Sequence, residues 1–141
     1  MTFKNINGDI DCDCTKGTID DLENLYIRKL RKDTLQEADF LSHWERGIKP
    51  EIENCESSCS YKGISVNQYH KSFEEQIINK FKTTFKINPK KGAYYLKFKI
   101  PKDAGVYKFA PEIDDESHYN FLKSDNFDVT CLESIETIKF A

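Results

Sequence analysis

Residues 94–100 of this 141-residue chain read YYLKFKI, in which every second side chain is apolar. A period of two predicts a β-strand with one buried face and one polar face. The buried set comprises Tyr94, Leu96, Phe98 and Ile100, and the polar set comprises Tyr95, Lys97 and Lys99. Pro101 ends this strand, residues 103–105 supply a turn, and residues 106–109 return as a second strand.

Residues 72–85, immediately upstream, have the period of an α-helix instead. Ser72 and Glu75 form a capping box, and Asn88-Pro89 gives a stop. The apolar stripe between them comprises Phe73, Ile77, Ile78, Phe81 and Phe85. Because an amphipathic helix buries such a stripe, we expect this helix to cover the apolar face of the strand and leave the lysine face in solvent.

The N-terminal half offers one further helix and two strands. Thr34 and Glu37 form a capping box, which predicts a helix over residues 34–46. Residues 25–30 (LYIRKL) fit either a strand or the end of an earlier helix, and residues 61–67 (YKGISVN) fit a strand.

These elements predict an α+β fold, because helices dominate the first half of the chain and strands the second. Further strand candidates lie at residues 118–123 and 129–140, whereas the polar residues 51–60 predict a loop. We therefore expect two to three helices packed on a mainly antiparallel sheet. No linker divides residues 1–141, so a single domain is predicted, with residues 1–16 as a flexible N-terminal arm.

Hydropathy predicts a soluble chain. No stretch approaches the roughly 20 consecutive apolar residues of a membrane-spanning helix. The first eight residues also lack the apolar core of a secretory signal. We therefore expect a cytoplasmic location and no membrane partner.

Four of the five cysteines occur as two close pairs, Cys12 with Cys14 and Cys55 with Cys59. Two such pairs could hold a zinc ion through four thiolates, although neither has the usual spacing of two intervening residues. Reduced thiols are the alternative, and they are typical of a cytosolic chain. We expect no other cofactor, and we expect Cys131 to be a small buried side chain.

A basic strand face suggests nucleic acid as one partner. Tyr95, Lys97 and Lys99 alternate as stacking rings and phosphate contacts do in proteins that bind single strands. Residues 71–111 hold ten lysines and three acidic residues, while both flanking segments have an acidic excess. The alternative is that Lys97 and Lys99 face carboxylates of the C-terminal strands. An isoelectric point of about 5.7 also argues against a dedicated nucleic-acid binder.

His118 is one candidate catalytic residue. It follows Asp114-Asp115-Glu116, so a carboxylate could orient it as a general base. It could equally be a residue at the start of a strand, solvated among acids. The chain has no glycine-rich phosphate loop and no nucleophile-elbow motif.

The order of the segments LYIRKL, KGISVN and later strands rich in Glu resembles the arginine–serine–glutamate layout of ADP-ribosyltransferase-like domains. The resemblance implies that Arg28 binds a phosphate of a dinucleotide and that Ser65 lies at the end of the second strand. It also implies that Glu112 or Glu133 orients the ribose and stabilises an oxocarbenium-like transition state. Without the resemblance, Arg28 is a surface cation and Ser65 a strand hydroxyl.

The sequence alone favours a small accessory or regulatory protein that binds another macromolecule, most simply another protein, and does not catalyse a reaction. Separated charge blocks suit an interface, and no catalytic set converges along the chain. An NAD-using enzyme and a binder of RNA or single strands stay as the alternatives.

Overall fold

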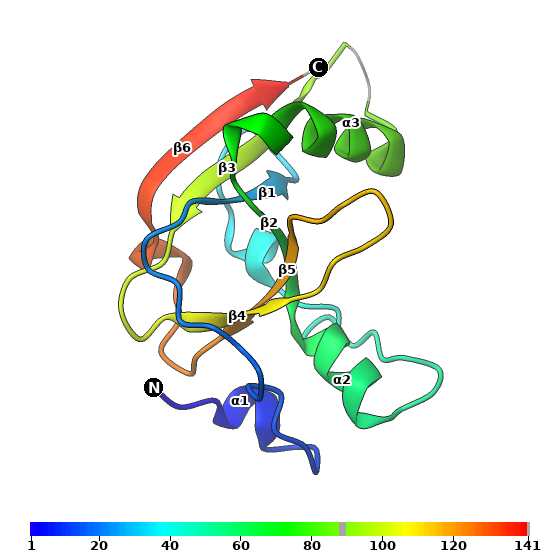
Figure 1. The fold of residues 1–141 in the computed structure, drawn as a ribbon, viewed down its shortest axis with the longest axis vertical. Coiled ribbons are helices and arrows are strands. Elements are labelled where there is room, and N and C mark those ends of the chain that lie inside the picture. The colour runs from blue at the N-terminus through cyan, green and yellow to red at the C-terminus, as the bar shows by residue number, and fades with distance from the viewer. Residues whose placement is uncertain (88–89, 141) are drawn as a thin grey trace.

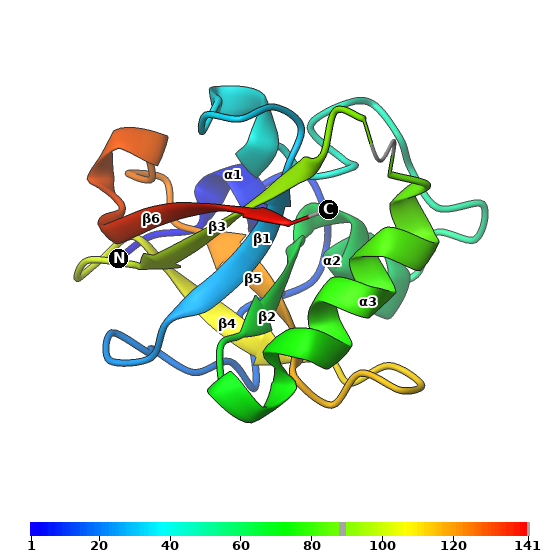
Figure 2. The same ribbon diagram turned by 90° about the horizontal axis from the view of Figure 1, so that it is seen from above.

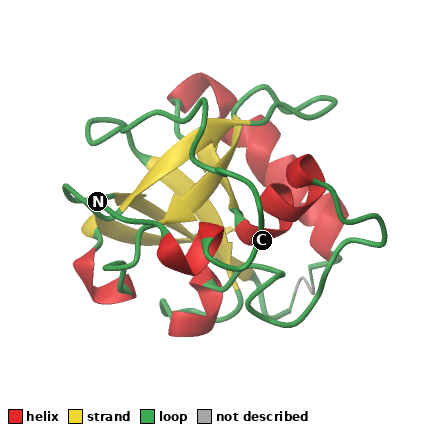
Figure 3. Ribbon diagram, turned by 90° about the horizontal axis from the view of Figure 1, so that it is seen from below, coloured by secondary structure: helices red, strands yellow, loops and turns green. Residues whose placement is uncertain are grey.

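The computed structural model describes residues 1–87 and 90–140, in which six antiparallel strands form one sheet. The strands are β1 (Tyr26–Leu30), β2 (Ile64–Gln68), β3 (Ala93–Lys99), β4 (Gly105–Phe109), β5 (His118–Lys123) and β6 (Glu133–Phe140). Their order across the sheet is β4-β5-β2-β1-β3-β6. The α-helices are α1 (Lys4–Asn7), α2 (Cys55–Lys62) and α3 (Glu74–Phe85). The predicted α+β class is confirmed, and Figure 3 shows the helices arranged around the strands.

The sheet is strongly curled, so that its two halves pack on each other. In Figure 1 the strands β3 and β6 run in a different direction from β4. Tyr26 of β1 stacks on Tyr107 of β4 with ring centroids 3.7 Å apart, although three strand boundaries separate them in the sheet. The main core lies inside this curl and includes Leu96 and Phe98 of β3 together with Phe121 of β5. The predicted apolar face of β3 is therefore buried by other strands.

Helix α3 covers the opposite face of β3, where Tyr95 lies (Figure 2). Ile77 and Phe81 of the helix pack with Tyr95 and with Ile27 of β1. The expectation that the helix covers the other face was wrong, because the curl of the sheet already fills that side. The predicted stop at Asn88-Pro89 lies outside the described residues.

Strands β1 and β2 separate after a short stretch of pairing. They pair only at Tyr26↔Gln68 and Ile27↔Asn67, whereas β1 and β3 stay paired from Tyr26 to Leu30. The end of β1 is thus free of β2 along one edge. The candidate site lies at this opening between β1 and β2.

The predicted helix over residues 34–46 is replaced by one 3₁₀ turn, η1 (Glu37–Phe40). The capping box at its start is formed by Gln36 and Asp39 rather than by Thr34 and Glu37. The Asp39 carboxylate also accepts a hydrogen bond from the backbone N–H of Arg31 at 3.0 Å. Both oxygens of the buried Asp39 carboxylate thus accept hydrogen bonds from backbone N–H groups, which fixes a turn. The chain therefore does not continue as an α-helix here.

Residues 51–60 were predicted to be a loop, and helix α2 begins inside them. Asn54 caps the helix by accepting a hydrogen bond from the Ser57 N–H at 2.8 Å, and Ser57 completes the capping box. The helix carries almost no apolar stripe, which is why its period does not show in the sequence.

Two disulfides tie the N-terminal segment to α2. Cys12 pairs with Cys55 and Cys14 with Cys59. The expectation of reduced thiols is therefore wrong for these four residues. The segment 1–16, predicted to be a flexible arm, contains α1 and buries Ile6 against the sheet.

Across residues 1–87 and 90–140, every helix is too short or too polar to cross a bilayer.

Candidate functional site

Arg28 of β1 fills the opening between β1 and β2. Its Nη1 donates to the backbone carbonyl of Ser65 on β2 at 2.6 Å, and its Nε donates to the backbone carbonyl of Asp39. Neutral carbonyls orient the guanidinium but leave its charge uncompensated. Within the described ranges no carboxylate forms an ion pair with Arg28. Burial lowers the pKa of Arg28 to about 10, so it remains a cation at neutral pH.

Ser65 and His118 form a hydrogen-bonded pair beside Arg28. The Ser65 Oγ lies 2.6 Å from Nε2 of His118, and Nδ1 of His118 lies 2.6 Å from the carbonyl oxygen of Ala110. A carbonyl can only accept, so Nδ1 carries the proton and, in the neutral ring, Nε2 accepts from the Ser65 hydroxyl. Ser65 is exposed and His118 is buried, so the serine faces the solvent side of the pair.

Glu112 approaches the same histidine from the loop between β4 and β5. Its Oε1 is 3.5 Å from Nε2 of His118, and its Oε2 accepts a hydrogen bond from Lys80 of α3. Lys80 also donates to buried Asp115 at 2.8 Å, and Asn67 of β2 donates to both oxygens of Asp115. These contacts fasten the loop to α3 and β2, and they fix where the Glu112 carboxylate lies.

Arg28, Ser65, His118 and Glu112 line one cleft of about 860 Å³. Its walls also include Phe85 at the end of α3, Arg46, and Phe109 at the end of β4. Phe85 and Phe109 are both exposed, at 53% and 56%. A cleft of this size that combines apolar walls with a few converging polar groups is typical of a small-molecule site.

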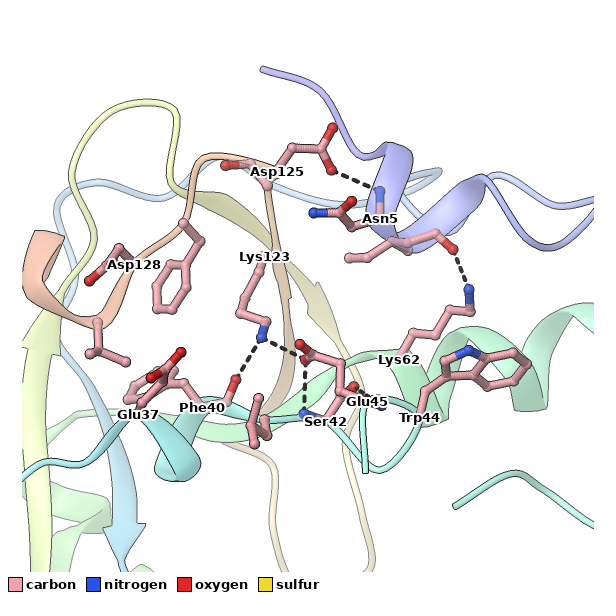
Figure 4. A pocket seen from close by; sticks show the side chains of 15 residues that line it. Asn5, Glu37, Phe40, Ser42, Trp44, Glu45, Lys62, Lys123, Asp125 and Asp128 are labelled. Atoms are coloured by element: carbon pink, nitrogen blue, oxygen red, sulfur yellow. Dashed lines mark hydrogen bonds and ion pairs between the residues drawn. The ribbon is translucent and has the colours of Figure 1, made fainter. Parts of the chain in front are cut away.

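A second cavity, of about 290 Å³, is shown in Figure 4. Lys123 points into it and is neutralised there by Glu45 at 2.6 Å, with the carbonyl of Phe40 at 2.8 Å. Lys62 beside Trp44 is also paired, with Asp9 and the carbonyl of Ile6. The lysines of this cavity are therefore satisfied within the protein, unlike Arg28.

The other predicted site residues lie elsewhere. Glu133 is on β6, opposite Lys99 of β3, and β3 separates it from β1. Lys97 lies opposite Glu136 of β6, and the register shifts between Lys97 and Lys99. Tyr95 is only 1% exposed, so its ring is not free to stack on a base. The pairing of β3 lysines with acids of a C-terminal strand follows the alternative that the sequence left open.

The four paired cysteines converge as expected for one site, but as disulfides. In the part of the chain that the structure describes, no group of three or more His, Cys, Asp or Glu residues is arranged to hold a metal ion. Cys131, half-buried, is the free cysteine and packs beside the main core. The zinc site stays a prediction.

Three positioning residues were missed by the sequence analysis, namely Asp39, Lys80 and Asp115. Asp115 was noted only as part of an acidic run before His118. No local pattern distinguishes Lys80 from the other lysines of its segment, so the sequence does not indicate its contacts. Their roles arise from contacts between segments far apart in the chain.

The chain matches no protein-family model, no curated protein and no solved structure.

Proposed function

We propose that this protein is an ADP-ribosyltransferase-like enzyme that binds a nicotinamide dinucleotide in the Arg28 cleft and cleaves its ribosyl–nicotinamide bond. The observation that supports it best is the meeting of Arg28, Ser65 and a glutamate, Glu112, around one cleft. These are three of the residues that the resemblance to this class of enzyme marks.

Arg28 supplies the anion-binding part of the proposal. A guanidinium held by two carbonyls keeps further N–H groups for a ligand and a positive charge without a carboxylate partner. Such a fork pairs well with the oxygens of a diphosphate. Because the arginine is already oriented, a bound diphosphate does not have to immobilise it.

His118 and Glu112 supply the acid–base part. In this proposal the ribose lies beside Ser65, and the developing positive charge on its anomeric carbon is stabilised by the Glu112 carboxylate. The imidazole of His118, or Glu112 itself, takes the proton of the attacking acceptor. Lys80 binds Oε2 of Glu112, so that Oε1 of Glu112 faces His118.

Chromatographic assay of nicotinamide released from NAD⁺ tests the proposal. We expect release by the unaltered protein and a loss of about 100-fold or more in Arg28→Ala and in Glu112→Gln. Lys32→Ala, an exposed lysine outside the cleft, is the matched control and should keep the activity. Absence of release together with absence of ADP-ribose binding would overturn the proposal.

Acyl transfer is a second candidate function. It is favoured by the 2.6 Å contact between an exposed serine hydroxyl and a histidine whose other nitrogen is fixed by a carbonyl. In that case Ser65 is a nucleophile and a fluorophosphonate probe labels it, with loss of labelling in Ser65→Ala. Labelling without nicotinamide release would select this function over the first.

A protein-binding role without catalysis stays a prediction. It rested on the lack of a converging set of ionisable groups in the sequence, and the Arg28 cleft supplies such a set. The cytoplasmic location also stays a prediction, and two disulfides argue against it, because disulfides persist mainly in oxidising compartments.

A further inference from the structure

We propose that a second anion subsite, lined by Lys29, Arg31 and Arg46, lies next to Arg28 and binds a phosphate in addition to the diphosphate. The inference rests on the proposed function and names its substrate class. The ligand is a nicotinamide dinucleotide that carries a further phosphate on the adenosine ribose, as NADP⁺ does.

A cavity of about 320 Å³ adjoins the main cleft at this point. The two cavities share Arg28, Arg46, Ser65 and Phe85 as lining residues, so they adjoin at Arg28. A ligand whose diphosphate contacts Arg28 therefore lies next to both the main cleft and this adjoining cavity.

The charges that line this adjoining cavity are unbalanced. Arg28, Lys29, Arg31 and Arg46 line it together with one carboxylate, that of Asp39. Asp39 is engaged by the backbone N–H groups of Arg31 at 3.0 Å and Gln36 at 2.8 Å. Among the residues that the structure describes, none of the four cations has an ion-pair partner.

The burial of two of these cations strengthens the case for an anion. Burial lowers the pKa of Lys29, as it does that of Arg28, and Asp39 offsets only part of the effect. Lys29 donates to the Leu30 carbonyl at 3.2 Å and lies 4.8 Å from the ring centre of Phe85. It is thus held in place by neutral groups, and a phosphate would supply the missing negative charge.

In this proposal the additional phosphate lies beside the diphosphate, on the cations that adjoin Arg28. Arg28 lies where the two cavities meet, and Arg31 lies beyond it, past the end of β1. Arginine forks recognise phosphate oxygens in preference to a ribose hydroxyl, which carries no charge. The exposed ring of Phe85 offers a surface for the adjoining base or sugar.

Calorimetric titration with ADP-ribose and with ADP-ribose 2′-phosphate tests this inference, since neither ligand can release nicotinamide. We expect the phosphorylated ligand to bind about tenfold tighter, the effect of one further charge-assisted contact. In the double variant Arg31→Gln/Arg46→Gln the preference should fall to about one. Lys32→Gln, an exposed neighbour outside both cavities, should retain it.

Each outcome has one meaning. Equal affinity for the two ligands in the unaltered protein would overturn the second subsite and leave the proposed function standing. Absence of binding by either ligand would overturn both. A preference that survives in the double variant would assign the extra phosphate to other residues, and would also overturn the subsite. Thermal melts of each variant verify that the fold is kept.

Discussion

Lys62, Lys123 and Arg28 are buried or half-buried cations, and they differ in what they contact. Lys62 and Lys123 each meet a carboxylate, whereas Arg28 meets only carbonyls. A half-buried cation without an ion-pair partner lowers the stability of a fold, so such a residue is typical of a site where function requires it. This contrast is the residue-scale reason to look for an anion at Arg28.

Replacement of Arg28 by lysine separates charge from geometry. Arg28→Lys keeps the cation but cannot donate to both Asp39 and Ser65 while also contacting a diphosphate. We expect the calorimetric affinity for ADP-ribose to fall by about tenfold or more. A variant that binds as tightly as the unaltered protein would show that only the charge matters.

Asp115 makes the stability of the protein sensitive to acid. Burial raises its pKa, but hydrogen bonds from Lys80, Asn67 and Ser117 outweigh burial and hold the pKa below its ordinary value of 3.8. A carboxyl with a lowered pKa contributes stability above 3.8 that is lost as the pH falls through its folded-state pKa.

We therefore expect Asp115→Asn to lower the free energy of unfolding at pH 7 by about 1–3 kcal/mol, and by less as the pH falls below 3.8. Urea unfolding between neutral and acidic pH measures the difference. A gap between the two proteins that widens in acid would contradict the assignment.

At the scale of elements, α3 and the loop between β4 and β5 act as one unit through Lys80. Lys80→Gln should release Glu112, lowering kcat for nicotinamide release by about tenfold while the KM for NAD⁺ changes little. The exposed Lys82 of the same helix is the matched control, and Lys82→Gln should have no effect. A change in KM alone would place Glu112 in binding rather than catalysis.

The spacing of apolar residues alone predicted the elements that bury one regular face. The alternation at residues 94–100 and the stripe ending at Phe85 led to β3 and α3, because each element buries side chains at its own regular spacing. The predicted helix over 34–46 was wrong because Asp39 bonds to the backbone and fixes a turn. Helix α2 was missed because disulfides and a cap hold it, in place of an apolar stripe.

At the scale of the whole molecule, the curled sheet brings the residues of the site together. Arg28 and Ser65 are 37 residues apart, and Ser65 and His118 are 53 residues apart. Each was a candidate in the sequence, but under two separate hypotheses, and no local pattern could place them together. Strand order joins them, because β5, β2 and β1 are neighbours in the sheet.

The disulfides cross-link segments 43 and 45 residues apart, so they constrain the unfolded chain strongly. Loss of one of them, in Cys14→Ser/Cys59→Ser, should lower the free energy of unfolding by about 2 kcal/mol, because Cys12–Cys55 still joins the two segments. Cys131→Ala, which removes a free thiol, is the control and should change it by less. Equal free energies of unfolding of the double variant and the unaltered protein would contradict this role.

A crystal structure with ADP-ribose tests the central claim most directly. We expect diphosphate oxygens within hydrogen-bond distance of the Arg28 guanidinium, with the terminal ribose against Ser65, His118 and Glu112. ADP-ribose bound in the cavity beside Lys123, or on the β3 lysine face, with the Arg28 cleft unchanged, would contradict it.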